Sequence, residues 1–290
     1  MGAAGQDPAT RPKQAVAHRG ASAYAPEHTV AAYRLAIEQG ADYVEQDLAI
    51  TRDGILICLH DDSLERTTNI EQVFPTRSTV DPQRGAHRWL AADFTLEEIK
   101  RLDAGSWFDP RFAGERVPTW EEAVELVGTK AGVYPELKTP VLYRERGLDM
   151  AASFVASAKK LGLLVSATTN PSRLVVQSFD AQVLQDLSRL IPGVPRTFLL
   201  EATDGPRWLT PDGLRSIAMF ATGIGPTKSL LDGRADLVRL AHETGLTVTP
   251  YTFRSSSPGR FRDVREEMRY FLQDIGADAL FTDNPDLFPR

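Results

Sequence analysis

The chain has 290 residues, of which 42% are hydrophobic and 25% are charged, so its composition is that of an ordinary globular protein with a substantial core. Its formal net charge of -6 at pH 7 argues against a nucleic-acid-binding protein, which normally carries a basic excess or a clustered basic face. The sequence has no run of about 18 consecutive apolar residues, so we expect no integral membrane association.

The chain begins with a polar segment, residues 1–14, which is rich in Ala, Gly and Pro and is predicted to be a flexible leader. This segment lacks the apolar stretch of a secretory signal. Such a leader is what remains when a signal peptide has been replaced by a start codon, and a natural cytosolic leader would look the same. Residues 15–290 are predicted to form a single domain.

Two periodicities alternate along this domain. Segments of helical period separate the strand-like runs, and several of them end in Gly, which is typical of a helix C-terminus. Eight strands that alternate with helices predict a (β/α)8 barrel, and a doubly wound open sheet is the alternative. The strand-like runs are AVAHRG (15–20), YVEQDLAIT (43–51), GVYPELKT (132–139), LVVQSFD (174–180), RTFLLE (196–201), TGIGPTK (222–228), LTVTPYTF (246–253) and ALFTDNPD (279–286).

One region interrupts the alternation. After the second strand, a turn at RDG leads into a further strand-like run, ILICLHD, which predicts a hairpin. Residues 62–117 are then loop-like around one short helix, TLEEIKRL. This segment is too long for an ordinary connection, so we expect a small inserted subdomain between strand 2 and helix 2. We expect it to lie above the barrel mouth, where long loops usually contribute to ligand binding.

Three carboxylates are predicted to gather at strand ends. Glu45 and Asp47 are two residues apart in a buried strand, so their side chains point the same way. Glu136 stands at the equivalent end of the next strand. Buried carboxylates repel one another unless a proton or a cation intervenes, and oxygen ligands favour Ca²⁺ or Mg²⁺. The alternative is that each acid pairs with an Arg or a Lys.

Two histidines and two cationic residues also stand at strand ends. His18 and Arg19 close the first strand, and His60 closes the hairpin strand. Two histidines at a metal site suit phosphodiester cleavage, because the nucleophile needs a base and the leaving alcohol needs an acid. Arg19 and Lys138 could hold the phosphate oxygens. The alternatives are that the histidines are structural and that the cations are counter-ions.

Seven segments resemble, in chain order, the motifs of the glycerophosphodiester phosphodiesterase family; they are HRG, PEHT, GADYVEQDLAITRDG, HDDSLERTT, PELK, QSFD and FTDNPD. The resemblance spans essentially the whole chain and is strongest to a periplasmic bacterial subgroup that hydrolyses deacylated phospholipids using Ca²⁺. It implies a barrel with a small inserted subdomain. It also implies these roles: acid and base for His18 and His60, phosphate binding for Arg19, metal binding for Glu45, Asp47 and Glu136, and a nearby polar contact for Lys138.

The resemblance implies hydrolysis of glycerophosphocholine or glycerophosphoethanolamine to sn-glycerol 3-phosphate and an alcohol, with one divalent cation, Ca²⁺ rather than Mg²⁺. The expected partner is this small molecule, and the expected location is the periplasm or outside the cell, with the cytoplasm as the alternative. Four residues at strand ends could line a glycerol pocket or belong to the barrel core: Gln177, Phe179, Tyr251 and Phe253.

Three other functions fit parts of this pattern. A lysophospholipase D-like phosphodiesterase would use the same residues but needs an apolar channel for an acyl chain. A non-catalytic binding module on the same fold would be expected to lack at least one histidine or ligand, and none is missing. A barrel aldolase with a Schiff base at Lys138 would have no use for paired histidines.

Overall fold

The computed structural model describes residues 12–81, 85–166 and 172–290. Residues 1–11 of the predicted leader therefore lie outside the described part of the chain. The last leader residue, Gln14, already belongs to the first strand, β1 (Gln14–Ala17). Among the described residues, no helix is both long and apolar enough to cross a membrane.

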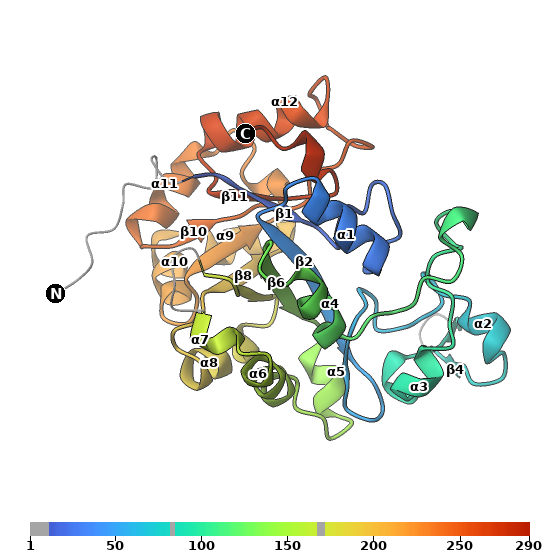
Figure 1. Cartoon of the computed structure of the whole chain (residues 1–290). Helices are drawn as coiled ribbons and strands as arrows, with labels where there is room; N and C mark the ends of the chain where they lie inside the picture. Colours follow the sequence, from blue (N-terminus) through green and yellow to red (C-terminus); the bar gives the residue numbers. More distant parts are fainter. Residues whose placement is uncertain (1–11, 82–84, 167–171) are drawn as a thin grey trace.

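Parallel strands form a nearly closed barrel at the centre of the molecule (Figure 1). The last two barrel strands are not paired as a ladder, but single backbone hydrogen bonds bridge the gap between them: Asp278 donates its N–H to Val248 and Phe253 donates to Phe281, both at 2.9 Å. The barrel confirms the predicted fold class, and the open-sheet alternative is wrong. The barrel strands after β1 are β2 (Tyr43–Ile50), β6 (Gly132–Leu137), β7 (Val176–Ser178), β8 (Arg196–Leu200), β9 (Gly223–Pro226), β10 (Thr247–Val248) and β11 (Ala279–Thr282).

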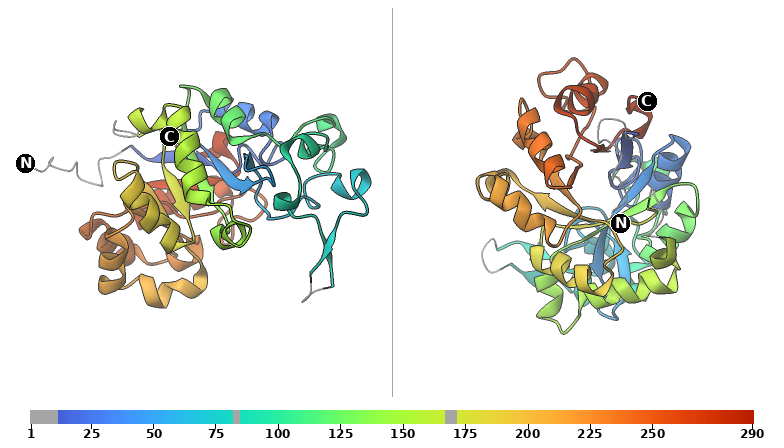
Figure 2. Two further views of the ribbon diagram at one scale, coloured as in Figure 1. Left: turned by 90° about the horizontal axis from the view of Figure 1, so that it is seen from below. Right: turned by 90° about the vertical axis from the view of Figure 1, so that its left-hand side faces the viewer.

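Helices surround the strands, as an end-on view shows (Figure 2). The Thr29 side chain caps the first of them, and Thr119 and Glu122 form a capping box at the second, which satisfies backbone N–H groups that have no partner within the helix. The helices between barrel strands are α1 (Val30–Glu38), α4 (Trp120–Val127), α5 (Pro140–Arg144), α6 (Met150–Lys160), α7 (Leu163–Ser166), α8 (Ala181–Leu190), α9 (Gly205–Trp208), α10 (Pro211–Ala218), α11 (Ala235–Glu243) and α12 (Val264–Arg269), which continues as a π-helix (Tyr270–Ile275).

Strand β2 separates two environments. Every residue of this strand is buried. Val44 and Leu48 belong to the main hydrophobic core, whereas Tyr43 belongs to a smaller apolar cluster together with residues of β1, β6 and β11. Because alternate residues of a strand face opposite ways, Glu45 and Asp47 share the face of Tyr43. The two carboxylates therefore lie on the inner face of the barrel.

The segment between β2 and α4 extends to one side of the barrel (Figures 1 and 2). It begins with β3 (Leu56–Cys58), which pairs antiparallel with β2, as the hairpin prediction required. Beyond it lie α2 (Ile70–Val73), the two-stranded ribbon of β4 (Thr79–Val80) and β5 (His87–Arg88), and α3 (Leu96–Ile99). Only α3 was predicted, from the longer run TLEEIKRL that contains it. The residues of α2, β4 and β5 show no such periodicity.

Candidate active site

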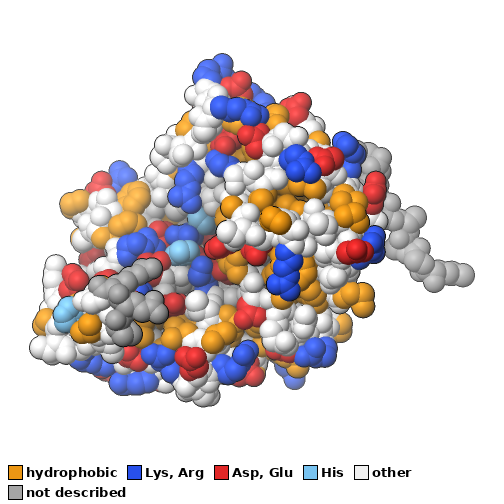
Figure 3. All heavy atoms as spheres, turned by 180° about the vertical axis from the view of Figure 1, so that it is seen from behind, with side chains coloured by type: hydrophobic (Ala, Val, Ile, Leu, Met, Phe, Trp, Pro, Cys, Tyr) orange, Lys and Arg blue, Asp and Glu red, His pale blue; other side chains and the backbone are white. Residues whose placement is uncertain are grey.

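A cavity of about 160 Å³ opens at the carboxyl ends of the barrel strands. The space-filling view shows histidine side chains among Lys and Arg side chains in a hollow of this face (Figure 3). This is the end of such barrels that carries active sites. The cavity is lined by His18, Arg19, Glu45, Asp47, His60, Glu136, Lys138, Gln177, Phe179, Leu199, Tyr251, Thr252, Arg254 and Phe281, so it contains every predicted site residue except Phe253.

The three carboxylates meet in the barrel because of the strand register. Asp47 of β2 pairs with Glu136 of β6, and Glu136 pairs with Gln177 of β7. Burial and the charge of Asp47 raise the pKa of Glu45 well above its usual range, and they raise the pKa of Glu136 to about 8. Burial opposes ionisation of Asp47 too. The charge of Lys138, a hydrogen bond from His28 and the charge of Arg19 nevertheless hold the pKa of Asp47 well below its usual range. Burial and the neighbouring charge of Asp47 therefore disfavour the ionised forms of Glu45 and Glu136 unless a further cation is present.

Arg19 contacts two of these carboxylates from a tight turn. Its backbone N–H donates to Oε2 of Glu45 at 2.7 Å, and its Nε lies 3.2 Å from Oδ2 of Asp47. The turn needs left-handed backbone, with φ of 59° at Arg19 and 86° at Gly20. A Cβ on Gly20 would lie 2.7 Å from the backbone of Ala32, so only glycine fits after the arginine.

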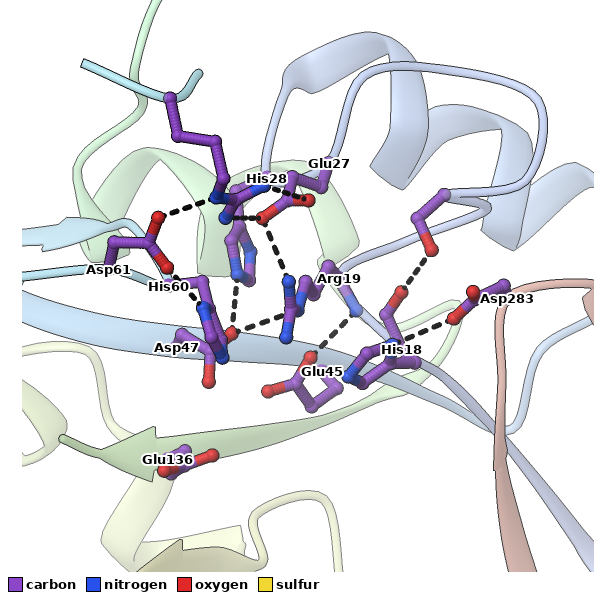
Figure 4. A network of polar contacts seen from close by, with 12 residues as sticks. His18, Arg19, Glu27, His28, Glu45, Asp47, His60, Asp61, Glu136 and Asp283 are labelled. Carbon is purple, nitrogen blue, oxygen red and sulfur yellow. Dashed lines mark hydrogen bonds and ion pairs between the residues drawn. The ribbon is translucent and has the colours of Figure 1, made fainter. Parts of the chain in front are cut away.

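The two predicted catalytic histidines are held in the same way. Nδ1 of His18 lies 2.7 Å from Oδ1 of Asp283, and Nδ1 of His60 lies 2.6 Å from Oδ1 of Asp61 (Figure 4). A carboxylate at Nδ1 favours the tautomer with its proton there, which leaves Nε2 free to exchange a proton with a ligand. Burial and the charge of Arg19 lower the pKa of His18, so this imidazole is neutral near pH 7.

Sequence reasoning missed His28, which contacts one of the three carboxylates, Asp47. Its Nε2 lies 2.9 Å from Oδ2 of Asp47, and both side chains are buried (Figure 4). His28, Glu45 and Asp47 each place one possible ligand atom within 4.8 Å of the others, which is a candidate metal site. The only sequence signal was the place of His28 in PEHT, a segment that carried the family resemblance without a role for its histidine.

Lys138 lies beside the carboxylates as predicted. Its Nζ is 3.2 Å from Oε1 of Glu136 and 3.8 Å from Oδ1 of Asp47. Burial would lower the pKa of Lys138, but the two carboxylates outweigh it and raise the pKa. A Schiff-base lysine needs an unprotonated amine, so this environment argues against the aldolase alternative.

Of the four predicted pocket residues, three line the cavity and one does not. Nε2 of Gln177 lies 3.5 Å from Oε1 of Glu45, and the rings of Phe179 and Tyr251 meet edge to face at 5.9 Å. The ring of Phe253 is fully buried and packs against Phe271 at 5.0 Å, so this residue occupies the core instead of the glycerol pocket. A position at the end of a strand does not by itself show whether a side chain lines the cavity or lies in the core, because large apolar residues occur on both faces of a strand.

The donor set fits a hard divalent cation. Glu45, Asp47 and Glu136 provide buried carboxylate oxygens, while Oε1 of Gln177 is buried and has no hydrogen-bond partner. Oxygen ligands of this kind suit Ca²⁺ or Mg²⁺. A bound cation would also favour the ionised forms of Glu45 and Glu136, which burial and the charge of Asp47 disfavour. The residues present are therefore chemically compatible with the predicted cofactor.

The fold and the site define a (β/α)8-barrel enzyme with acid–base and anion-binding groups at the carboxyl ends of its strands. The model of the glycerophosphoryl diester phosphodiesterase family matches residues 18–287. The chain belongs to this family and is a phosphoric diester hydrolase.

Relatives and solved structures agree with this assignment. The chain is 36% identical to a glycerophosphodiester phosphodiesterase of Bacillus subtilis, over 95% of this chain and 85% of that protein. It is 30% identical to one of Haemophilus influenzae, over 93% and 87%. Among solved structures, a phosphodiesterase of Oleispira antarctica in complex with the product sn-glycerol-3-phosphate has a TM-score of 0.72, 28% identity and coverage of 94% of each chain. An Agrobacterium tumefaciens glycerophosphodiester phosphodiesterase has a TM-score of 0.71, 28% identity and coverage of 96% and 99%.

Proposed function

We propose that the protein hydrolyses glycerophosphodiesters, such as glycerophosphocholine or glycerophosphoethanolamine, to sn-glycerol 3-phosphate and a free alcohol. The observation that carries this proposal is that His18 and His60, each with a carboxylate at Nδ1, line one cavity with Arg19 and the buried carboxylates. The product in the Oleispira antarctica structure supports the substrate class.

Arg19 and Lys138 hold the phosphate oxygens of the substrate, and the two histidines move the protons. One histidine takes a proton from the nucleophile through Nε2, and the other donates a proton to the leaving alcohol oxygen. The nucleophile is water, or the glycerol 2-hydroxyl, which would form a cyclic phosphate first. Glu45, Asp47 and Glu136 would hold a divalent cation, Ca²⁺ rather than Mg²⁺, which neutralises charge on the phosphoryl oxygens when bound.

The cavity lining favours small substrates over lysophospholipids. Its apolar side chains are confined to Phe179, Leu199, Tyr251 and Phe281, and its volume of about 160 Å³ suits a glycerol unit better than an acyl chain. Lysophospholipids remain the second candidate substrate, because Phe179 is 38% exposed and offers an apolar edge beside the opening.

A three-substrate assay tests the proposal. Protein stripped of metal with a chelator and then supplied with Ca²⁺ or Mg²⁺ is incubated with glycerophosphocholine, glycerophosphoethanolamine or a lysophosphatidylcholine, and release of sn-glycerol 3-phosphate and choline is measured. We expect product from the first two substrates, more with Ca²⁺ than with Mg²⁺ and none without metal. Full activity without metal would contradict the cofactor, and release of choline from lysophosphatidylcholine alone would identify the second candidate.

We also propose a periplasmic or secreted location, on the resemblance to the periplasmic subgroup. Fractionation of the source cells, followed by detection of the protein with an antibody, tests this location. Recovery with the cytoplasmic fraction would contradict it.

A further inference from the structure

Arg66, in the segment inserted between β3 and α4, connects two functional side chains. Its Nε donates to Oδ2 of Asp61 at 2.5 Å, and its two terminal nitrogens donate to Glu27 at 2.7 and 3.0 Å. Asp61 in turn lies 2.6 Å from Nδ1 of His60, and Glu27 accepts from Nη1 of Arg19 at 3.0 Å. One guanidinium group is therefore bonded both to Asp61, which holds His60, and to Glu27, which holds the phosphate-binding Arg19.

We propose that Arg66 is a positioning residue for the hydrolysis, which acts on His60 through Asp61 and on Arg19 through Glu27. This inference rests on the functions proposed for His60 and Arg19. Figure 4 shows the two carboxylates, Asp61 beside His60 and Glu27 beside Arg19. Arg66 does not line the cavity, so its effect on the reaction passes through these neighbours.

Arginine is suited to this role because its planar group presents five N–H donors in a fixed fork, whereas lysine presents a single point charge. Arg66 uses all three of its nitrogens, one on Asp61 and two on Glu27. A lysine at this position could hold one carboxylate but not both in the same orientation. The carboxylate orientations matter because Asp61 selects the tautomer of His60 and Glu27 fixes one end of the Arg19 guanidinium.

The link also joins the inserted segment to the connection between β1 and α1. Glu27 lies in the connection between β1 and α1, and its side chain is 13% exposed, whereas Asp61 follows β3. Burial would raise the pKa of Glu27, but hydrogen bonds from Arg66 and the charge of Arg19 lower it to about 2. Glu27 is therefore ionised at neutral pH and keeps both arginines in place.

The experiment measures kcat and KM for glycerophosphocholine, at saturating metal, in Arg66→Met, Arg66→Lys and a matched control, Arg88→Met. Arg88 belongs to the same inserted segment and is also paired, with Glu65 at 2.7 Å, but it touches neither Asp61 nor Glu27. We expect Arg66→Met to lower kcat by about tenfold to a hundredfold and to raise KM, the range seen when a supporting residue is lost. Arg66→Lys should show a smaller loss of the same kind, and Arg88→Met should stay within about twofold.

Double-mutant cycles separate positioning from a general structural effect. In an Asp61→Ala background, Arg66→Met should lower kcat no further, and in a Glu27→Ala background it should raise KM no further. Equal losses in the parent and in both backgrounds would overturn the inference, as would parent-like kinetics of Arg66→Met. If Arg66→Met does not fold, the same cycles are run with Arg66→Lys, whose retained charge preserves one carboxylate contact.

A third variant, His60→Ala, distinguishes failure of this inference from failure of the proposed function. If His60→Ala lowers kcat by about 10² to 10⁴ while Arg66→Met behaves like the parent protein, only the positioning role is wrong. If His60→Ala itself retains the parent rate, the proposed catalytic function of His60 is wrong, and the positioning role fails with it.

Discussion

Nε2 of His28 lies 2.9 Å from Oδ2 of Asp47, and Nδ1 of the same ring lies 2.9 Å from the hydroxyl of Tyr33. Burial raises the pKa of Tyr33 well above its usual range, so its hydroxyl keeps its proton and can donate it to Nδ1. Nε2 then carries the ring proton and donates it to Asp47, which is the tautomer that the network selects. His28 is thereby placed to orient a carboxylate ligand rather than to bind the cation itself.

Replacement of His28 should weaken metal binding without abolishing catalysis at high metal concentration. We expect His28→Leu to reduce the apparent Ca²⁺ affinity by about tenfold to a hundredfold, because the carboxylate loses its orienting donor. His28→Gln, whose amide N–H can replace Nε2–H, should lose less, and both variants share the strain of the positive φ at this position. Titration of activity with Ca²⁺ checks this. If the glutamine variant is as weak as the leucine variant, His28 is a ligand instead.

Removal of the metal should destabilise the folded protein. Without a cation, Glu45, Asp47 and Glu136 remain buried beside one another, and a ligand that binds only the folded state stabilises it by about 2.7 kcal/mol at a hundred times its Kd. We therefore expect chelation to lower Tm and Ca²⁺ to restore it. Thermal unfolding followed by circular dichroism measures the change. The matched control is Glu136→Gln, in which the response of Tm to Ca²⁺ should be much smaller.

The group of three carboxylates could largely be predicted from sequence patterns. The two-residue spacing of Glu45 and Asp47 fixes their shared face because alternation is a property of any strand. Their meeting with Glu136 depends on the register of β2 and β6, which no single strand encodes. The barrel order made that meeting predictable, since consecutive parallel strands end at the same edge.

The supporting contacts could not be predicted in this way. Asp283, which orients His18, lies 265 positions further along the chain, and the two residues are neighbours only because β11 pairs with β1. The Arg66 link likewise depends on the path of the inserted segment, in which the sequence predicted one short helix and otherwise loop. Contacts between side chains of distant segments depend on how the whole chain folds. Local sequence patterns therefore do not predict them.

The link between Glu27 and Arg66 should make stability depend on pH in the acid range. The pKa of Glu27 is about 2 in the folded protein, below the ordinary value of 4.5. A lowered pKa contributes stability that is present above the unfolded pKa and is lost as the pH falls through the folded pKa. Glu27 should therefore stabilise the protein fully above about pH 5 and lose this contribution between about pH 4.5 and 2.

Urea unfolding of the parent protein and of Glu27→Gln, from pH 7 down to pH 2.5, measures this contribution. We expect the variant to be less stable by about 2 kcal/mol near neutrality. This value is smaller than the lowered pKa alone would give, because Arg66 is 42% exposed and solvent screens its charge. The two curves should approach one another as the pH falls. A difference that stays constant over the whole range would show that Glu27 stabilises the fold through packing and not through its charge.

Replacement of either catalytic histidine should lower turnover while metal binding survives. His18→Ala and His60→Ala should each lose about 10² to 10⁴ in kcat on glycerophosphocholine, the range expected for one positioned proton-transfer group. Neither residue is among the carboxylates proposed to hold the cation, so both variants should keep the increase of Tm with Ca²⁺. Parent-like rates in both variants would contradict the acid–base roles and leave the reaction to Arg19 and the metal.

The two variants should differ on a substrate with a better leaving group. A nitrophenolate leaves as a stable anion and needs little protonation, so the variant that lacks the general acid should recover most of its rate on a nitrophenyl phosphodiester. The variant that lacks the general base should not recover, because its nucleophile still has to lose a proton. Comparison of kcat for the two variants on both substrates therefore assigns the acid and the base to His18 and His60. Equal recovery in both variants would mean that neither histidine acts as the base.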